Sequence, residues 1–458
     1  MAIRETVERE VKLSAGEAFR LPELGGEAIE PRLFVSTYHD TADHRLARRG
    51  ITLRHRLENG KALWQLKLPQ GRSRLELEAP GAPAAPPEDL LSLLSGHLRG
   101  ESLQPIARLR TRREGIRADG AEIVHDSVAV LDHQRVTRSF EELEVELLDG
   151  DEKTLRRLEK ALRRAGAGDG ESRPKVFQAL DLDLQAERDV PVEDGSPAGT
   201  LRAQLGEQAE RVLAHDPGTR LGTDPKELHR MRVATRRLRA FLRAGGELLD
   251  PEWADPLRSE LRWLGGVLGP VRDLDVLIDR LAAGVETLGS DGIEGHKLVQ
   301  TLERERRRAR RVLQSALESG RYFALLDALD RPARTVAEEP TLPQIHAAEH
   351  KKLRKAVGAL GPGSPDDELH EARIKVKRAR YAAELLGDSG YVKAAKVLQD
   401  VLGEHQDAVV AEERLRALAA KQPAWATAAG RLIERERQRA AQGRAEWGAA
   451  WKRLAKTA

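Results

Sequence analysis

The stretch TVEREVKL, residues 6–13, carries Glu8, Glu10 and Lys12 at every second position. The residues between them are mostly apolar: Val7, Val11 and Leu13. Successive side chains of a β-strand point to opposite faces of the sheet, so the two carboxylates and the ammonium share one face. The stretch therefore predicts a β-strand with one charged face and one mostly apolar face.

The rest of the N-terminal half has the same period of two. Turn-forming residues separate the segments, and Asn59-Gly60 is a strong hairpin signal. The alternating segments are residues 51–58, 62–68, 73–79, 106–113, 121–131 and 139–148. Residues 153–165 have helical spacing instead. This half is predicted to be a mostly antiparallel sheet with a few helices.

The C-terminal half has a different period. Residues 187–200 are rich in proline, glycine and acidic side chains, which predicts a linker. From Leu201 onward, apolar residues recur every three or four positions, as in helices. The fold class is therefore a two-domain α+β protein, with a sheet domain at 1–186 and an all-helical domain at 201–458.

The helical half contains an internal repeat. The segment LHRMRVATRRLR, residues 228–239, aligns with LHEARIKVKRAR, residues 369–380, and pairs His229 with His370. Further on, LGPVRDLDV, residues 268–276, aligns with LGEHQDAVV, residues 402–410. Two copies of one helical unit, at about 201–330 and 340–458, explain both matches.

The composition excludes several classes of protein. A chain of 458 residues is long for one core, so two or three domains are expected. The sequence has no cysteine, which excludes disulfides, thiolate metal sites and cysteine nucleophiles. We find no apolar run near the ~20 residues of a membrane span, and the charged N-terminus lacks the apolar core of a signal peptide. A cytoplasmic protein without membrane contact is expected.

The charged strand faces allow two interpretations. Any single strand of this kind is explained by a solvated sheet face. However, some strands carry three acids and others three bases, as in ELEVE (142–146) and RLRTRR (108–113). A sheet curled around these faces would enclose bases that neutralise phosphate oxygens and carboxylates that hold Mg²⁺ or Mn²⁺. A small phosphate chain is the ligand that would need both the bases and the carboxylate-bound cation.

These residues resemble the CYTH, or triphosphate tunnel metalloenzyme, superfamily. Residues 8–12 form the ExExK motif of that family, and Tyr38-His39-Asp40-Thr41 is similar to its Tyr-Tyr-Asp-Thr. The order of the segments WQLKLP, RLELE, RLRTRR, VHDSV, ELEVE and RPKVFQAL extends the resemblance over essentially residues 1–186. His39 in place of tyrosine is a minor departure.

The CYTH resemblance implies an eight-stranded antiparallel barrel around a tunnel and a metal-dependent phosphoanhydride hydrolase. The implied catalytic residues are Glu8, Glu10 and Lys12. The implied metal ligands are Glu8, Glu10, Asp126, Glu144 and Glu146. The implied phosphate-binding residues are Lys12, Arg54, Arg56, Lys67, Arg110, Arg112 and Lys175. The implied cofactor is Mg²⁺ or Mn²⁺.

The duplicated helical segments carry basic stripes. Positions three, seven and ten beyond a residue return to nearly the same face of an α-helix. His229, Arg232, Arg236 and Arg239 therefore share one face, and the second copy repeats this pattern. One such stripe is explained by a solvated helix, but few acids interrupt either stripe, and both begin with a histidine. Protonated histidines would strengthen the binding of a polyanion as the pH falls.

This duplicated pattern resembles the CHAD domain. The resemblance covers roughly Leu201 to the C-terminus and implies two four-helix units with pseudo-two-fold symmetry, whose stripes face a shared groove. It also implies binding of inorganic polyphosphate. The residues assigned to this binding are His229, Arg232, Arg236, Arg237, Arg239, Arg243, His370, Arg373, Lys377, Arg378 and Arg380.

Several functions fit this sequence. The first is hydrolysis of inorganic tripolyphosphate in the barrel, with polyphosphate bound by the helices. The alternatives are a weakly catalytic binding module of polyphosphate granules and a hydrolase of an organic triphosphate such as thiamine triphosphate. Nucleic-acid binding fits the charge, but aromatic residues are only 3% of the chain, and stacking on bases needs them.

Overall fold

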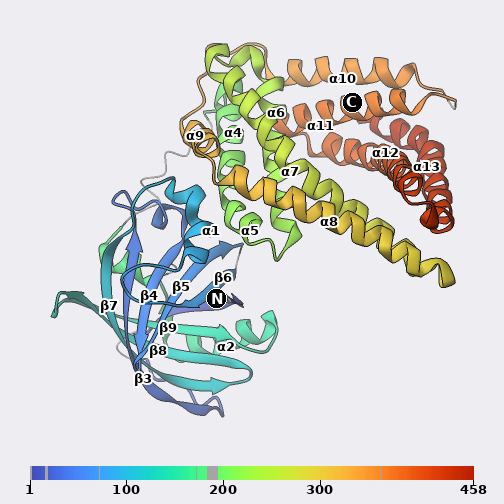
Figure 1. Cartoon of the computed structure of the whole chain (residues 1–458). Helices are drawn as coiled ribbons and strands as arrows, with labels where there is room; N and C mark the ends of the chain where they lie inside the picture. The colour runs from blue at the N-terminus through green and yellow to red at the C-terminus, as the bar shows by residue number, and fades with distance from the viewer. Residues whose placement is uncertain are drawn as a thin grey trace. The chain divides into compact units, whose positions relative to one another are not determined.

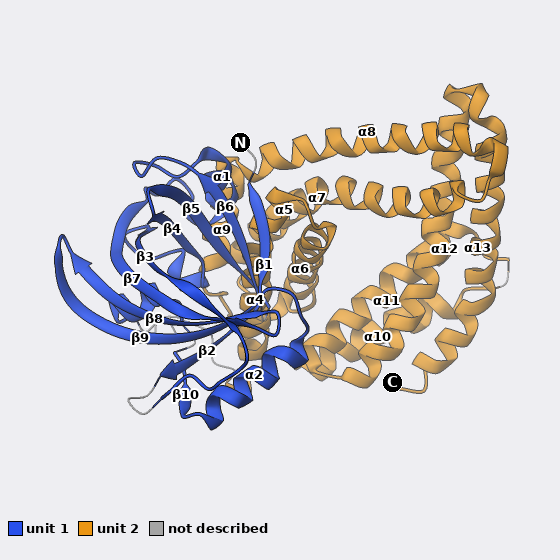
Figure 2. Ribbon diagram, turned by 90° about the horizontal axis from the view of Figure 1, so that it is seen from below, with its two compact units in different colours: residues 1–189 blue, residues 190–458 orange. Residues whose placement is uncertain are grey.

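The computed structural model describes residues 3–15, 19–71, 73–171, 173–182, 194–361 and 363–457. The chain divides into two compact units, residues 1–189 and 190–458 (Figure 2). The boundary lies in the predicted linker, half of which, residues 187–193, lies outside the described residues. The predicted α+β architecture is confirmed, with strands in the first unit and helices in the second (Figure 1).

The first unit is built on one antiparallel sheet of ten strands. The strands are β1 (Arg4–Glu8), β2 (Glu10–Ala15), β3 (Glu27–Asp40), β4 (Thr52–Glu58), β5 (Lys61–Gln70), β6 (Ser73–Pro80), β7 (Gln104–Ala118), β8 (Ala121–Asp132), β9 (Arg135–Leu147) and β10 (Ala167–Asp169). Their hydrogen-bonded order is β1-β6-β5-β4-β3-β7-β8-β9-β2-β10. The predicted Asn59-Gly60 turn joins β4 to β5, and both residues have the positive φ of such a hairpin.

The expected closed barrel of eight strands needs correction. In the described residues the ladder has two free edges, β1 and β10, so hydrogen bonds do not close it into a ring. The first predicted strand is instead split at Arg9, because β1 pairs with β6 and β2 pairs with β9. The Arg9 carbonyl accepts a hydrogen bond from the Leu147 N–H at 2.9 Å. The covalent chain thus joins the two sides of the curled sheet.

Apolar residues cover the outer face of this sheet where α2 packs against it. Leu13, Leu143 and Val145 are fully buried and pack with leucines of α2 (Glu152–Arg164). Elsewhere the unit has the helices α1 (Glu88–Leu98) and α3 (Lys175–Leu180) and a short 3-10 helix, η1 (Ala47–Arg49). Val7 departs from the predicted apolar face, since it is 46% exposed.

The second unit is helical. Its α-helices are α4 (Pro197–Ala214), α5 (Asp216–Leu221), α6 (Pro225–Ala244), α7 (Pro251–Val285), α8 (Gly292–Leu317), α9 (Gly320–Asp330), α10 (Leu342–Gly358), α11 (Asp366–Leu386), α12 (Ser389–Lys421) and α13 (Ala426–Leu454). Short 3-10 helices lie at η2 (Gly246–Leu248), η3 (Gly289–Asp291) and η4 (Pro423–Trp425). None of the helices in the described part of the chain is both long and apolar enough to cross a membrane.

The predicted repeats lie on equivalent helices. The first aligned segments fall on α6 and α11, and the second fall in the middle of α7 and α12. One core is built mainly from α4, α6, α7, α8 and α9, and a second from α10 to α13. A third core packs the far ends of α7 and α8 against α12 and α13. The two halves therefore meet both at α6–α11 and at these far ends.

Candidate functional site

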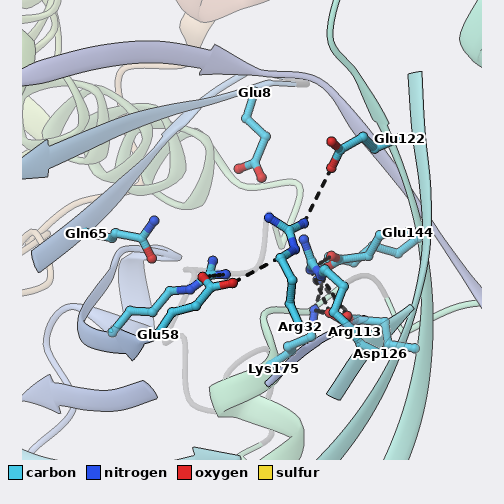
Figure 3. Close-up of polar contacts among 12 residues, drawn as sticks. Glu8, Arg32, Glu58, Gln65, Arg113, Glu122, Asp126, Glu144 and Lys175 are labelled. Atoms are coloured by element: carbon cyan, nitrogen blue, oxygen red, sulfur yellow. Dashed lines mark hydrogen bonds and ion pairs between the residues drawn. The ribbon is translucent and has the colours of Figure 1, made fainter. Parts of the chain in front are cut away.

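Charged side chains converge on the inner face of the curled sheet. Figure 3 shows Glu8, Gln65, Glu122 and Glu144 pointing from different strands toward a common space. Glu8 is only 5% exposed, and Asp126 is fully buried. A solvated sheet face would leave such carboxylates in water, so the structure favours the interpretation of a charged interior.

Lys175 occupies the centre of a carboxylate cluster at one end of this interior. It begins α3, and its Nζ lies 3.0 Å from Asp126 and 2.7 Å from Glu144, with Glu142 as a third partner. Oxygens of the three carboxylates lie within 4.8 Å of one another, a spacing that a cation could bridge. In this structure the ammonium of Lys175 already fills that role.

Two further bases neutralise the same cluster. Arg113 donates to Asp126 and Glu144 at 2.7 Å, and Lys12 lies 3.0 Å from Glu142 and 3.3 Å from Glu144. Burial alone would raise the pKa of Glu144, but the charges of Lys175, Lys12 and Arg113 hold that pKa well below its usual value. Three carboxylates thus face three bases. The predicted metal ligands Asp126 and Glu144 belong to this cluster, whose carboxylate spacing could hold a metal ion.

A second carboxylate group is compensated less directly, by the charges of Lys67 and Arg113. Glu10 on β2 lies directly opposite Glu146 on β9. Among the described residues, neither carboxylate has a hydrogen bond or an ion pair. Burial, and next the charge of Glu8, raise the pKa of Glu146 to about 7. Like charges in register destabilise a sheet, and a divalent cation between Glu10 and Glu146 would remove that repulsion.

These carboxylates fit a hard divalent cation. Glu8, Glu10 and Glu146 offer only carboxylate oxygens, the donors that Mg²⁺ and Mn²⁺ prefer. Glu8 accepts hydrogen bonds from Lys67 at 2.7 Å and is thereby oriented. A cavity of about 290 Å³ opens beside them, lined by Glu8, Glu10, Lys12, Pro69, Gly71, Ser73 and Arg74. The three residues predicted to be catalytic therefore line one cavity.

Two predicted phosphate ligands lie deeper on the same face. Arg54 donates to Gln65 at 2.7 Å and to the Tyr38 hydroxyl at 3.2 Å. The Arg56 guanidinium lies 3.7 Å from the centre of the Phe34 ring. Burial, and next the charge of Arg54, lower the pKa of Arg56 to about 10. A bound anion would relieve the repulsion between these two cations.

The structure does not place Arg110 and Arg112 in the interior. Both are exposed on the outer face of β7, and the Arg112 side chain is 66% exposed and paired with Glu114. The alternate positions, including Thr111 and Arg113, face inward instead. The sequence RLRTRR has arginines at both odd and even positions. Alternation alone therefore does not show which of these arginines point to the inner face of the sheet. Sequence reasoning missed Arg113, because its position opposite Asp126 depends on a strand register that the sequence does not show.

The basic stripes of the helical unit face one another. Lys377 on α11 lies near Arg373 of its own helix and near Arg232 and Arg236 of α6. Burial, and next the charges of these three arginines, lower the pKa of Lys377 from 10.5 to about 7. Four cations from the two repeats therefore share one electrostatic environment. We call Arg232, Arg236, Arg373 and Lys377 the basic groove.

The other predicted polyphosphate-binding residues of the helical unit lie in several different surroundings. His229 and Arg239 are exposed on α6, and the ring of His370 contacts Gln406 at 2.8 Å. Arg243 lies close enough to Arg378 for the two charges to interact.

Two predicted residues, Arg237 and Arg380, lie outside the basic groove. Both pair with Glu384 at 3.0 Å, and Arg380 is buried against Tyr381. They lie where α6 meets α11, in the junction between the two repeats. The helical period placed them near the basic stripe, but the packing of the second helix covers them.

Comparisons with known proteins agree with this architecture. A model of the CYTH domain matches residues 5–173, and a model of the CHAD domain matches residues 203–416. Both resemblances found in the sequence are thereby confirmed. Uncharacterized proteins from two strains of Mycobacterium tuberculosis are each 34% identical to this chain over 418 residues, covering 83% of it and 81% of the relative.

Two solved structures align with more than half of this chain. PptA from Streptomyces chartreusis aligns with a TM-score of 0.50 and 24% identity, over 56% of this chain and 99% of PptA. The CHAD domain from the plant Ricinus communis aligns with a TM-score of 0.48 and 27% identity, over 57% of this chain and 91% of that one. The chain therefore belongs to the family of the mycobacterial proteins and carries a CYTH domain followed by a CHAD domain.

Proposed function

We propose that the CYTH domain is a metal-dependent hydrolase of inorganic tripolyphosphate or short polyphosphate. The observation that carries this proposal is the directly opposed pair Glu10 and Glu146, neither of which has a hydrogen bond or ion pair among the described residues. Glu10 also lines a cavity together with the bases Lys12 and Arg74. A site that only bound phosphate would need bases without opposed carboxylates. Acids and bases together suit a phosphate chain that arrives with a divalent cation.

In this mechanism Glu8, Glu10 and Glu146 would hold Mg²⁺ or Mn²⁺, which would neutralise charge on the phosphate oxygens. Lys12 and Arg74 line the cavity and would hold the terminal phosphoryl group in line for attack by water. The attack forms a new P–O bond and breaks the bridging P–O–P bond, which releases orthophosphate and pyrophosphate. Positioning and charge stabilisation dominate such reactions.

An inorganic substrate fits the interior better than an organic triphosphate. Phe34 and Tyr38 are aromatic residues on the inner face that could stack on an organic base, but they are only 4% and 5% exposed. The Arg56 guanidinium covers Phe34, and Arg54 bonds the Tyr38 hydroxyl. Both rings therefore support arginines, which favours a ligand made of phosphate groups alone.

The test is phosphate release from tripolyphosphate by the full chain, with Mg²⁺, with Mn²⁺ and with excess chelator. Glu10→Gln/Glu146→Gln should abolish release, whereas Glu141→Gln should not, because Glu141 is an exposed residue of the same strand paired with His125. Release from thiamine triphosphate in preference to tripolyphosphate would instead support the organic alternative. No release from the folded wild type would contradict hydrolysis.

We further propose that the CHAD domain binds inorganic polyphosphate in the basic groove. Polyphosphate offers regularly spaced anions without bases, which suits arginine and lysine in a domain with few aromatic rings. Arg232→Gln/Arg373→Gln should weaken binding of long polyphosphate and reduce its salt dependence. Tighter binding of RNA than of polyphosphate at physiological salt would contradict this assignment.

A further inference from the structure

Each repeat of the helical unit holds one groove arginine in the same way. In the first repeat, Arg232 of α6 donates a hydrogen bond to Asp273 of α7 at 3.0 Å. Gly269 precedes Asp273 by one helical turn, and a methyl group on Gly269 would lie 3.9 Å from the Arg232 Nη2. The guanidinium therefore lies over the glycine and ends at the carboxylate.

The second repeat reproduces this arrangement with different helices. Arg373 of α11 forms an ion pair with Asp407 of α12 at 3.8 Å. Gly403 precedes Asp407 by one turn, and a methyl group on Gly403 would lie 3.6 Å from both the Nε and the Nη2 of Arg373. The same three residue types thus meet twice at equivalent positions.

Stability of the fold does not explain these aspartates. The Asp273 and Asp407 side chains are 68% and 47% exposed, and exposed ion pairs contribute little to folding. In a basic groove, a carboxylate also opposes the attraction of a polyanion. A duplicated acid at this place therefore needs a role other than folding or simple attraction.

We propose that Asp273 and Asp407 are positioning residues for polyanion binding, an inference that rests on the proposed binding of polyphosphate. Each aspartate holds a long arginine side chain against the neighbouring helix. A guanidinium has five N–H donors, and the aspartate leaves several of them free for phosphate oxygens. Holding the side chain beforehand reduces the conformational entropy that binding would otherwise remove.

A second effect acts in the same direction. Asp407 lies close enough to Lys377 for its negative charge to favour the protonated lysine, against the burial and the three arginines that disfavour it. Asp273 and Asp407 likewise both favour the charged form of Arg373. The two carboxylates therefore partly offset the burial and the repulsion that favour the neutral forms of these cations.

The test compares two double variants of the full chain that change the net charge equally. The groove variant is Asp273→Asn/Asp407→Asn. The control variant, Asp255→Asn/Asp400→Asn, alters exposed aspartates of the same two helices that pair with Arg258 and Lys396. Both gain two positive charges, so the sum of charges alone predicts equal or tighter binding by the groove variant. Affinity for long-chain inorganic polyphosphate is measured by titration calorimetry at pH 7.

Positioning predicts the opposite order. We expect the groove variant to bind about five- to tenfold more weakly than the control variant, with unchanged thermal unfolding. Asp273→Glu/Asp407→Glu, which keeps both carboxylates, should recover most of the affinity. Binding by the groove variant as tight as the control would overturn the positioning role. Absence of binding by the wild type would overturn polyphosphate binding itself, and the positioning role with it.

Discussion

The titration of Lys377 gives the helical domain a specific pH dependence. This lysine is held among Arg232, Arg236 and Arg373 and has a pKa of about 7 without ligand. A polyanion in the basic groove would favour the ammonium form and raise that pKa. Binding should therefore take up a proton, so that affinity is full below pH 7 and is lost as the pH rises above 7.

The size of this effect follows from linkage. If the bound polyanion keeps Lys377 charged up to pH 8, a free pKa of about 7 means that the binding constant falls about tenfold between pH 6 and pH 8. A tenfold change corresponds to about 1.4 kcal/mol. The pKa of His229 is also lowered, first by burial and next by Arg272, and a polyanion would raise it in the same way. A variant is needed to separate the two residues.

Lys377→Arg keeps the positive charge and removes the titration. Polyphosphate affinity of the wild type and this variant should be measured at pH 6, 7 and 8 at one ionic strength. The histidines and the terminal phosphates of the ligand titrate alike in both proteins. The loss of affinity from pH 6 to pH 8 should be about tenfold smaller in Lys377→Arg. Equal losses in the two proteins would refute the reasoning.

Three further results are expected from the sheet domain. Arg113→Gln should abolish tripolyphosphate hydrolysis and destabilise the domain by about 3 kcal/mol, because it leaves the buried Asp126 carboxylate with less positive charge beside it. Arg112→Gln, on the outer face, should retain activity. Equal rates of phosphate release by the two variants would contradict this assignment. Leu143→Ala, under α2, should lower the free energy of unfolding by about 2–5 kcal/mol in denaturant titration, and a smaller loss would mean that the site collapses. Chelation of divalent cations should stop phosphate release without unfolding the domain, which circular dichroism would check; unfolding would assign the metal a structural role.

The sequence predicted those features that have a regular period. Strict alternation predicted six of the strands, and the duplicated segments predicted equivalent helices in the two halves. The long strand β3 was missed as an element, and the first strand was predicted as continuous although it divides at Arg9. The alternation of residues within a strand does not show which other strand it pairs with, because pairing depends on contacts between residues distant in sequence.

The site was predicted less completely than the fold. Glu8, Glu10 and Lys12 lie at one cavity, as their motif suggested. The inner residue Arg113 could not be chosen over Arg112, since adjacent arginines occupy both faces of β7. The alternation of the strands also does not show that Lys175 would pair with Asp126, because that contact depends on how α3 packs against the sheet.

The division of the first strand at Arg9 has a consequence for the order of folding. Residues 4–8 pair with residues about 70 positions later in β6, and residues 10–13 pair with residues at least 130 positions later in β9. During synthesis the start of the chain must therefore wait until β9 has emerged before both of its halves can pair. Contacts so distant in sequence slow folding, so the domain should acquire its native structure late and all at once. β1 and β2 would then be among the last strands to pair.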